Sequence, residues 1–335
     1  MASFSMACSK MCASSFAARF VLSNLRSNIG AVSQTRLLTS NQQSNGKVDK
    51  SLLSKLRKET GFGFAKCMES LRLNKNDYNE ALRWLEAEAE KQGWEKATKL
   101  QGRTVSEGLV GVLVDGNFAA MVEVNCETDF VARNELFVDL VSNIANIAVS
   151  KRKKIVDQNQ KINAFGSQLE HLREVIPEHK LRNEKIQNSN GETVGDSVTR
   201  TIGKLGENIK INKVVTMTTE EANVIGKYVH GSFVTSSGGC FLGRYGGIVV
   251  IKPKHDEVKL DSMFSLANKL AQHVVGMNPA VISEHDREDK EAEKGDSSDV
   301  LLEQDYLLDE KMTVKDLVEK EQVEVVDFVR YECGA

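Results

Sequence analysis

The chain has 335 residues, of which 41% are hydrophobic and 27% charged, a composition typical of a globular protein with two or three compact units. No apolar run approaches the roughly 20 residues that a membrane-spanning helix needs, so no membrane segment is predicted. The six cysteines form no Cys-x-x-Cys pair, which argues against a zinc site or a disulfide framework and favours a reducing compartment.

The first 46 residues form a basic, serine-rich segment without acidic side chains. This composition is typical of an organelle transit peptide, and cleavage is expected between Arg36 and Lys47; the alternative is a disordered tail. Removal of residues 1–48 takes five of the 44 basic residues and none of the 47 acidic ones, which leaves 39 against 47 and a net charge near −8. Such an acidic chain is a poor candidate for broad nucleic-acid binding.

Residues 47–92 are predicted to form three short helices, because apolar side chains recur there at helical spacing in three stretches. Asn76 or Asp77 can cap the third helix. The unit resembles ubiquitin-associated domains, whose loop between the first two helices binds proteins; here that loop is Thr60-Gly61-Phe62-Gly63. Residues 93–107, rich in lysine and glycine, are predicted to be a linker.

Residues 108–200 are predicted to form a first subdomain with a polar helical insertion. Val110–Val114 and Ala119–Val124 are predicted strands around a tight turn, and a helix with Phe137 on its apolar face follows. Within the polar stretch, Gln168–Leu181 is expected to be helical. The basic run Lys151-Arg152-Lys153-Lys154 is interpreted as a solvated face after a helix end.

Residues 201–335 are predicted to form a second, related subdomain. Lys227–Val234 and Gly247–Ile251 are predicted strands around a glycine-rich connection, and a helix beginning near Met263 repeats the pattern of the first subdomain. A helix capped by Thr313 and a strand over Val323–Tyr331 complete it. The fold class is therefore α+β: a small three-helix domain, then two related subdomains, each an antiparallel sheet covered by helices.

The sequence contains no recognisable catalytic apparatus. It has no phosphate-binding loop, no His-Glu-x-x-His zinc motif and no Gly-x-Ser-x-Gly elbow. Asn74-Lys75-Asn76-Asp77 fits a short guanine-recognition motif, but without a phosphate loop it is interpreted as a chance match. We therefore predict a binding protein, with no catalytic residue, cofactor or metal of its own.

The most specific pattern is Thr128-Asp129-Phe130-Val131, between a strand-like segment and a helix. Threonine and aspartate favour helix starts, and Phe130 at such a turn can be presented outward, although periodicity alone favours a core aromatic there. The segment closely resembles the signature of the elongation factor Ts family. Similarity to that family extends from about Leu53 to Gly334.

Further matches lie around Arg57, at Leu205-Gly206-Glu207-Asn208 and at Tyr228-Val229-His230-Gly231. The resemblance implies exchange of GDP for GTP on elongation factor Tu, with Phe130 entering between two helices of the GTPase domain and Asp129 disturbing its magnesium-bound phosphate site. The residues expected to bind the GTPase are Thr128, Asp129, Phe130, Val131, Leu205, Gly206, His230, Arg57 and Phe64.

The transit-like N-terminus indicates the mitochondrial branch of the family. So does an acidic loop near Glu284–Asp299, where bacterial members carry a long helical hairpin. The resemblance thus implies mitochondrial elongation factor Tu as partner, in the matrix, with no direct contact to nucleotide, nucleic acid or membrane. Two alternatives remain open: a scaffold or ubiquitin-type binding module built on residues 47–92, and a matrix RNA-binding protein that uses Lys151–Lys154.

Overall fold

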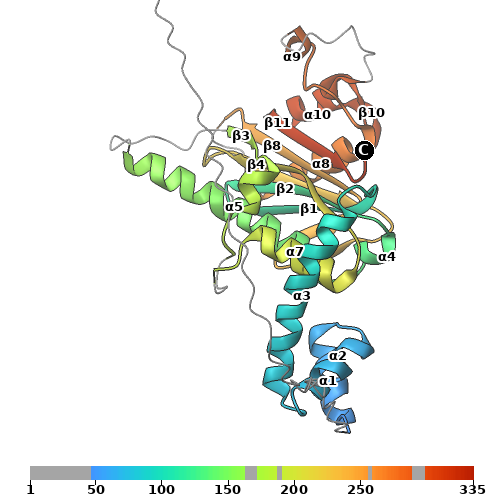
Figure 1. Ribbon diagram of the computed structural model, residues 1–335. Helices are drawn as coiled ribbons and strands as arrows, with labels where there is room; N and C mark the ends of the chain where they lie inside the picture. The colour runs from blue at the N-terminus through green and yellow to red at the C-terminus, as the bar shows by residue number, and fades with distance from the viewer. Residues whose placement is uncertain (1–46, 163–171, 187–190, 256–258, 289–298) are drawn as a thin grey trace, which may run out of the picture. The chain divides into compact units, whose positions relative to one another are not determined.

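The computed structural model of the chain is shown in Figure 1. It describes residues 47–162, 172–186, 191–255, 259–288 and 299–335. The predicted transit peptide, residues 1–46, lies outside the described residues, as does the middle of the acidic loop.

The three helices predicted after residue 47 are present: α1 (Lys50–Thr60), α2 (Phe64–Leu73) and α3 (Tyr78–Leu100). Asp49 and Asp77 cap α1 and α3, because each carboxylate accepts hydrogen bonds from N–H groups of the first turn. The helices share a small core of buried side chains. Its members are Leu53, Leu56, Cys67, Leu71, Ala81 and Leu85.

The prediction of a linker over residues 93–107 is wrong at its start, because α3 continues to Leu100. Gly93, which favoured a break, instead permits a close helix crossing. A Cβ at Gly93 would lie 2.2 Å from the carbonyl oxygen of Thr199, and one at Gly203 would lie 2.4 Å from that of Ala89. Helix α3 therefore packs directly on α7 through two facing glycines, at the cost of some helix propensity.

The first sheet is antiparallel and contains six strands in the order β3-β4-β2-β1-β7-β6. The predicted hairpin is confirmed: β1 and β2 pair along their full lengths around a turn at Gly116. The elements of this half are β1 (Glu107–Asp115), β2 (Phe118–Cys126), α4 (Asp129–Ala132), α5 (Glu135–Ile162), β3 (Leu172–Val175), α6 (Glu178–Arg182), α7 (Val194–Leu205), β4 (Ile209–Thr218), β6 (Thr235–Ser237) and β7 (Cys240–Gly243).

The second sheet has three antiparallel strands in the order β11-β8-β5. As predicted, a helix follows β8, Thr313 caps a short helix, and the chain then forms a last strand. The elements of this half are β5 (Val224–His230), β8 (Tyr245–Pro253), α8 (Leu260–Met277), α9 (His285–Glu288), a 3₁₀ turn at Leu301–Glu303, β9 (Asp305–Tyr306), β10 (Asp309–Thr313), α10 (Val314–Lys320) and β11 (Val323–Glu332). Strands β9 and β10 pair with each other in a separate two-stranded sheet.

The two sheets pack face to face, between helices on their outer faces (Figure 1). Side chains alternate between cores: Val122 of β2 packs toward α5, whereas Met121 packs against the second sheet. In β8, Val249 faces α8 and Ile248 faces the first sheet. Both sheets are therefore buried on both faces, which makes their central strands almost uniformly apolar.

The predicted subdomain boundary at residue 200 is wrong, because later strands return to the first sheet. β4 pairs with β2, and β7 pairs with β1 from within the glycine-rich connection assigned to the second subdomain. The helix expected over Gln168–Leu181 is also wrong where it is described: Leu172–Val175 pairs with β4 as an edge strand, and only Glu178–Arg182 is helical.

Candidate functional site

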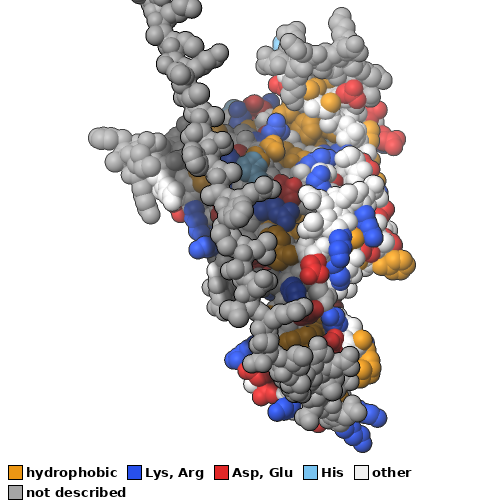
Figure 2. Space-filling view, in the orientation of Figure 1, with side chains coloured by type: hydrophobic (Ala, Val, Ile, Leu, Met, Phe, Trp, Pro, Cys, Tyr) orange, Lys and Arg blue, Asp and Glu red, His pale blue; other side chains and the backbone are white. Residues whose placement is uncertain are grey.

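The predicted signature forms a sharp turn between β2 and α4. Thr128 is the N-cap of α4, and its hydroxyl oxygen accepts a hydrogen bond from the Val131 N–H at 3.4 Å. Val131 and Ala132 are buried in the first core, whereas Phe130 is 82% exposed. Figure 2 shows hydrophobic side chains at the surface where α4 lies. The prediction that Phe130 is presented outward is therefore confirmed, and the core position that periodicity alone favoured is not found, since Val131 and Ala132 fix the helix and leave the ring in solvent.

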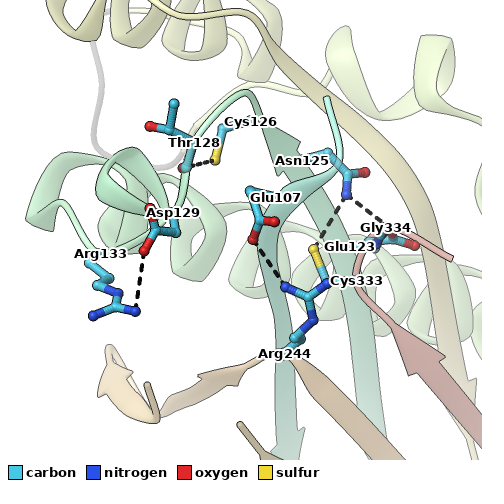
Figure 3. Close-up of polar contacts among 10 residues, drawn as sticks. All are labelled: Glu107, Glu123, Asn125, Cys126, Thr128, Asp129, Arg133, Arg244, Cys333 and Gly334. Atoms are coloured by element: carbon cyan, nitrogen blue, oxygen red, sulfur yellow. Dashed lines mark hydrogen bonds and ion pairs between the residues drawn. The ribbon is translucent and has the colours of Figure 1, made fainter. Parts of the chain in front are cut away.

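Asp129 lies beside the exposed ring and pairs with Arg133 one turn later. The carboxylate and guanidinium are 3.3 Å apart, and both side chains are about half exposed (Figure 3). Such a surface pair contributes at most about 1 kcal/mol to stability. A binding partner can therefore displace Arg133 from Asp129 at small cost.

Two carboxylates, one from each segment, form reciprocal hydrogen bonds between the signature turn and the residues that follow α7. Glu207 accepts hydrogen bonds from the Thr128 N–H at 3.0 Å and from the Thr128 hydroxyl at 2.7 Å. In return Glu127 accepts from the Asn208 N–H at 2.8 Å and from Arg103 at 3.2 Å. Hydrogen bonds to a charged acceptor are shorter and stronger than neutral ones, so the two segments hold each other in place.

The same contact brings the predicted residues Leu205 and Gly206 next to the signature. Helix α7 ends at Gly206, whose left-handed backbone (φ 80°) allows its N–H to bond the Ile202 carbonyl at 2.8 Å. Leu205 is half-buried against the first core, and Gly206 is exposed. The turn after α7 thus supplies a rigid neighbour to α4.

A buried polar cluster anchors β2, the strand that leads into the turn, to the end of β11 (Figure 3). The carboxylate of Glu123 is fully buried, and one of its oxygens accepts from Asn125, Asn212 and the Gly334 N–H at 3.0–3.1 Å. Its other oxygen lies 3.3 Å from the ammonium of Lys213. These partners compensate the burial of a charge and join the second sheet to the strand that leads into the signature.

The thiol of Cys126 completes the support of the turn. It donates to the Thr128 carbonyl, with sulfur and oxygen 3.2 Å apart. Burial raises the pKa of this thiol, so it remains protonated and able to donate.

His230 lies apart from the signature, at the exposed end of β5 in the second sheet. Its ring neighbours Tyr228 and Tyr245, with centroids 6.3 and 6.2 Å away, and the three residues line a cavity of about 460 Å³ together with Arg330. The His230 carbonyl accepts from the Arg244 N–H, and the Arg244 side chain pairs with Glu107 at 3.0 Å (Figure 3).

Arg57 and Phe64 form a third group, on α1 and α2 of the three-helix unit. The guanidinium of Arg57 lies over the ring of Phe64, 5.8 Å from its centroid, and Phe64 is 52% exposed. Met68, one turn further along α2, is also exposed. Figure 2 shows hydrophobic side chains at the surface over α2 as well.

Glu127 and Glu207 are the residues that sequence reasoning missed as parts of the site. Each belongs to a segment that resembles the family, directly before Thr128 and directly after Gly206. Their place in these segments was the available signal, but nothing in the sequence shows that each carboxylate bonds to the other segment.

Within the described parts of the chain, no group of three or more His, Cys, Asp or Glu side chains could hold a metal ion. Among the described helices, none combines the length and the hydrophobicity that a membrane span requires.

Comparison with known proteins places these features in one family. The family described as "Elongation factor TS" matches residues 127–297, and that described as "Elongation factor Ts, mitochondrial, N-terminal" matches residues 35–95. A relative from Nematostella vectensis, named "Elongation factor Ts, mitochondrial", is 56% identical over 293 residues, which cover 86% of this chain and all of the relative. Proteins of the same name from Branchiostoma floridae and Xenopus laevis are 38% and 36% identical, covering 86% and 85% of this chain and 90% and 87% of their own lengths.

Proposed function

The chain belongs to the elongation factor Ts family, and from this premise we propose that it promotes GDP release from mitochondrial elongation factor Tu during translation elongation. The observation that carries the proposal is the solvent-exposed ring of Phe130, on a turn fixed from both sides. The activity is non-covalent: the protein acts by binding and needs no catalytic residue or cofactor of its own.

The mechanism is thermodynamic linkage. A protein that binds the nucleotide-free GTPase more tightly than the loaded form must weaken nucleotide binding by the same factor. Aromatic side chains are frequent anchors of protein interfaces, because a buried ring contributes a large share of the binding energy. We infer that Phe130 is this anchor, and that its burial is available only when the GTPase has opened its nucleotide site.

The neighbours of Phe130 have separate parts in this proposal. Asp129 acts on the magnesium-bound phosphate site once the GTPase displaces Arg133, which is a weak surface partner. Thr128 and Val131 fix the turn, and Leu205 and Gly206 form the adjoining surface. His230 is assigned to a second contact on the other sheet.

Arg57 and Phe64 are assigned to a third contact, on the three-helix unit. An arginine stacked on a half-exposed aromatic ring offers both charge and apolar area to a partner. Three separated contacts on one chain allow binding energy far from the nucleotide to contribute to its release.

We further propose that the protein acts in the mitochondrial matrix and that residues 1–46 direct its import. The acid-free N-terminal composition and the mitochondrial names of the relatives support this. N-terminal sequencing of the protein isolated from mitochondria tests it: the expected start lies between residues 37 and 47, and an intact start at Met1 or Ala2 would contradict import by cleavage.

The RNA-binding alternative depends on Lys151–Lys154, and three of these four residues already pair with carboxylates. They lie inside α5 rather than after its end, which corrects the interpretation from sequence. Arg152 is buried and pairs with Glu174 at 3.0 Å, and Lys151 and Lys153 pair with Glu184 and Asp115. Of the four, only Lys154 is classed as exposed, so the run offers little free charge to a phosphate backbone.

The deciding experiment is GDP release measured directly. Mitochondrial elongation factor Tu is loaded with a fluorescent GDP and mixed with residues 47–335 and excess unlabelled nucleotide. We expect the rate of GDP release to increase in proportion to the added protein. Release at the intrinsic rate, or capture of other partners but no GTPase from a mitochondrial extract, would favour the scaffold alternative.

A further inference from the structure

Helix α4 contains only four residues, so it cannot maintain its own orientation. A single turn of helix is unstable in isolation, because nucleation fixes several backbone angles for one hydrogen bond. The direction in which Phe130 leaves the protein must therefore be set by contacts from other parts of the chain. Burial of Val131 and Ala132 holds the inner side of α4, and both hydrogen bonds that its cap residue Thr128 donates go to Glu207, in the turn after α7.

We propose that Glu207 is the positioning residue for Phe130, an inference that rests on the proposed function. Both oxygens of its carboxylate accept hydrogen bonds from one residue, Thr128, through the backbone N–H and the hydroxyl. Thr128 in turn caps α4 two residues before Phe130. Glu207 thus acts on the ring through Thr128 and need not touch the GTPase.

The arrangement is a helix-capping pattern in which the acidic residue comes from a distant segment. In the capping box of α10, Asp316 accepts from the N–H and hydroxyl of Thr313, three residues earlier. Glu207 makes the same two bonds to a threonine 79 residues away in the sequence. The start of α4 is therefore fixed to the first core by tertiary structure.

The reciprocal bond removes the remaining freedom of the turn. Glu127, the residue before Thr128, accepts from the Asn208 N–H, the residue after Glu207. Two antiparallel links between neighbouring residue pairs prevent the turn from rotating about either one. Loss of Glu207 leaves one link, and the Thr128 N–H loses its charged acceptor, so α4 can reorient while the core stays folded.

A direct contact of Glu207 with the GTPase would also lower exchange, and a double-mutant cycle separates the two roles. We would measure GDP release with the parent chain, Glu207→Ala, Phe130→Ala and the double variant, each at saturating and limiting concentrations. Glu207→Ala is expected to slow exchange about tenfold in the parent, the usual consequence of losing hydrogen bonds to a charged group. In the Phe130→Ala background the same change is expected to have less than about a twofold effect, since no ring remains to be positioned.

Asp316→Asn is the matched control, because it weakens the equivalent pair of bonds at α10 in the second sheet's half of the chain. It should leave exchange per folded molecule unchanged. Hydrogen exchange of the peptide that contains Thr128 gives a readout independent of activity, and it should become faster in Glu207→Ala. Glu207→Gln, which keeps one acceptor oxygen, should be intermediate and serves if the alanine variant does not fold.

Equal losses from Glu207→Ala in both backgrounds would assign Glu207 a direct contact and overturn the inference. So would full activity or unchanged hydrogen exchange in Glu207→Ala. These outcomes leave the proposed function intact. A parent chain that does not accelerate GDP release overturns the proposed function itself, and the positioning role with it.

Discussion

Replacing Phe130 by alanine should impair nucleotide exchange strongly and stability hardly at all. Full burial of a phenylalanine ring contributes roughly 1.5–3 kcal/mol, and this ring is already 82% exposed, so its removal should cost about 0.5 kcal/mol or less. For a chain of this size such a loss lowers the melting temperature by only about 1–2 °C. Loss of an aromatic interface anchor typically costs about 2 kcal/mol of binding, which would slow exchange roughly 30-fold if it falls on the nucleotide-free complex.

The assay compares fluorescent-GDP release from elongation factor Tu with thermal melting of the same preparations. Phe137→Ala provides the opposite control, because that ring is fully buried in the first core and its loss should cost about 3–5 kcal/mol of stability. Phe264→Ala, 48% exposed on α8, controls for loss of surface apolar area. A large melting drop in Phe130→Ala, with exchange unchanged per folded molecule, would make Phe130 structural and refute the site assignment.

Three further predictions, two of them with a control substitution, test other parts of the structure. Gly203→Ala should destabilise the protein by about 2 kcal/mol in denaturant unfolding, because its Cβ would meet the Ala89 carbonyl at 2.4 Å, whereas Gly102→Ala, with open space around it, should be neutral. Burial lowers the pKa of His273, so on acidification the unfolded chain binds a proton before the folded chain does. The free energy of unfolding should therefore be at its full value above about pH 6.5 and decrease as the pH falls below it, less steeply in His273→Gln. Arg152→Ala should lower the free energy of unfolding by about 2 kcal/mol, because its hydrogen bonds to Thr218 and Glu174 are lost, and it should leave RNA binding unchanged. Lys154→Ala should lower the free energy of unfolding by less than about 0.5 kcal/mol. Unchanged denaturant unfolding of Gly203→Ala would contradict the close helix crossing, and stability that does not depend on pH would contradict the role of His273. Loss of RNA binding in Lys154→Ala would support the RNA-binding alternative.

Local signals in the sequence predicted the local structure well. The Asp115-Gly116 turn, the caps at Asp77 and Thr313 and the last strand all depend on residues close in sequence, and all are present. The exposed ring of Phe130 was different. Periodicity alone favoured a core position, and the resemblance to a family reversed that interpretation.

The errors share one physical cause, which is that tertiary contacts decide what local composition leaves open. Gly93 marks a linker by composition, yet it lies at a helix crossing where a Cβ would meet the Thr199 carbonyl of α7. The segment Leu172–Val175 is exposed and short, and becomes a strand because β4 presents an unpaired edge. The return of β7 to β1 could not be read from the chain order, because a glycine-rich connection does not show which sheet it joins.

An exposed aromatic ring is useful in exchange only if the free protein already holds it in the bound direction. Ordering a loose segment on binding would consume part of the interaction energy, and the coupling between two ligands is typically only about 1–3 kcal/mol. One ring contributes a similar amount, so little can be lost to ordering. Three features of the structure therefore have a common effect: the burial of Val131 and Ala132, the Glu207–Thr128 bonds, and the cluster around Glu123 of β2. They fix a four-residue helix to two packed sheets, and in the proposed mechanism this lets the burial of Phe130 in the GTPase act against nucleotide binding.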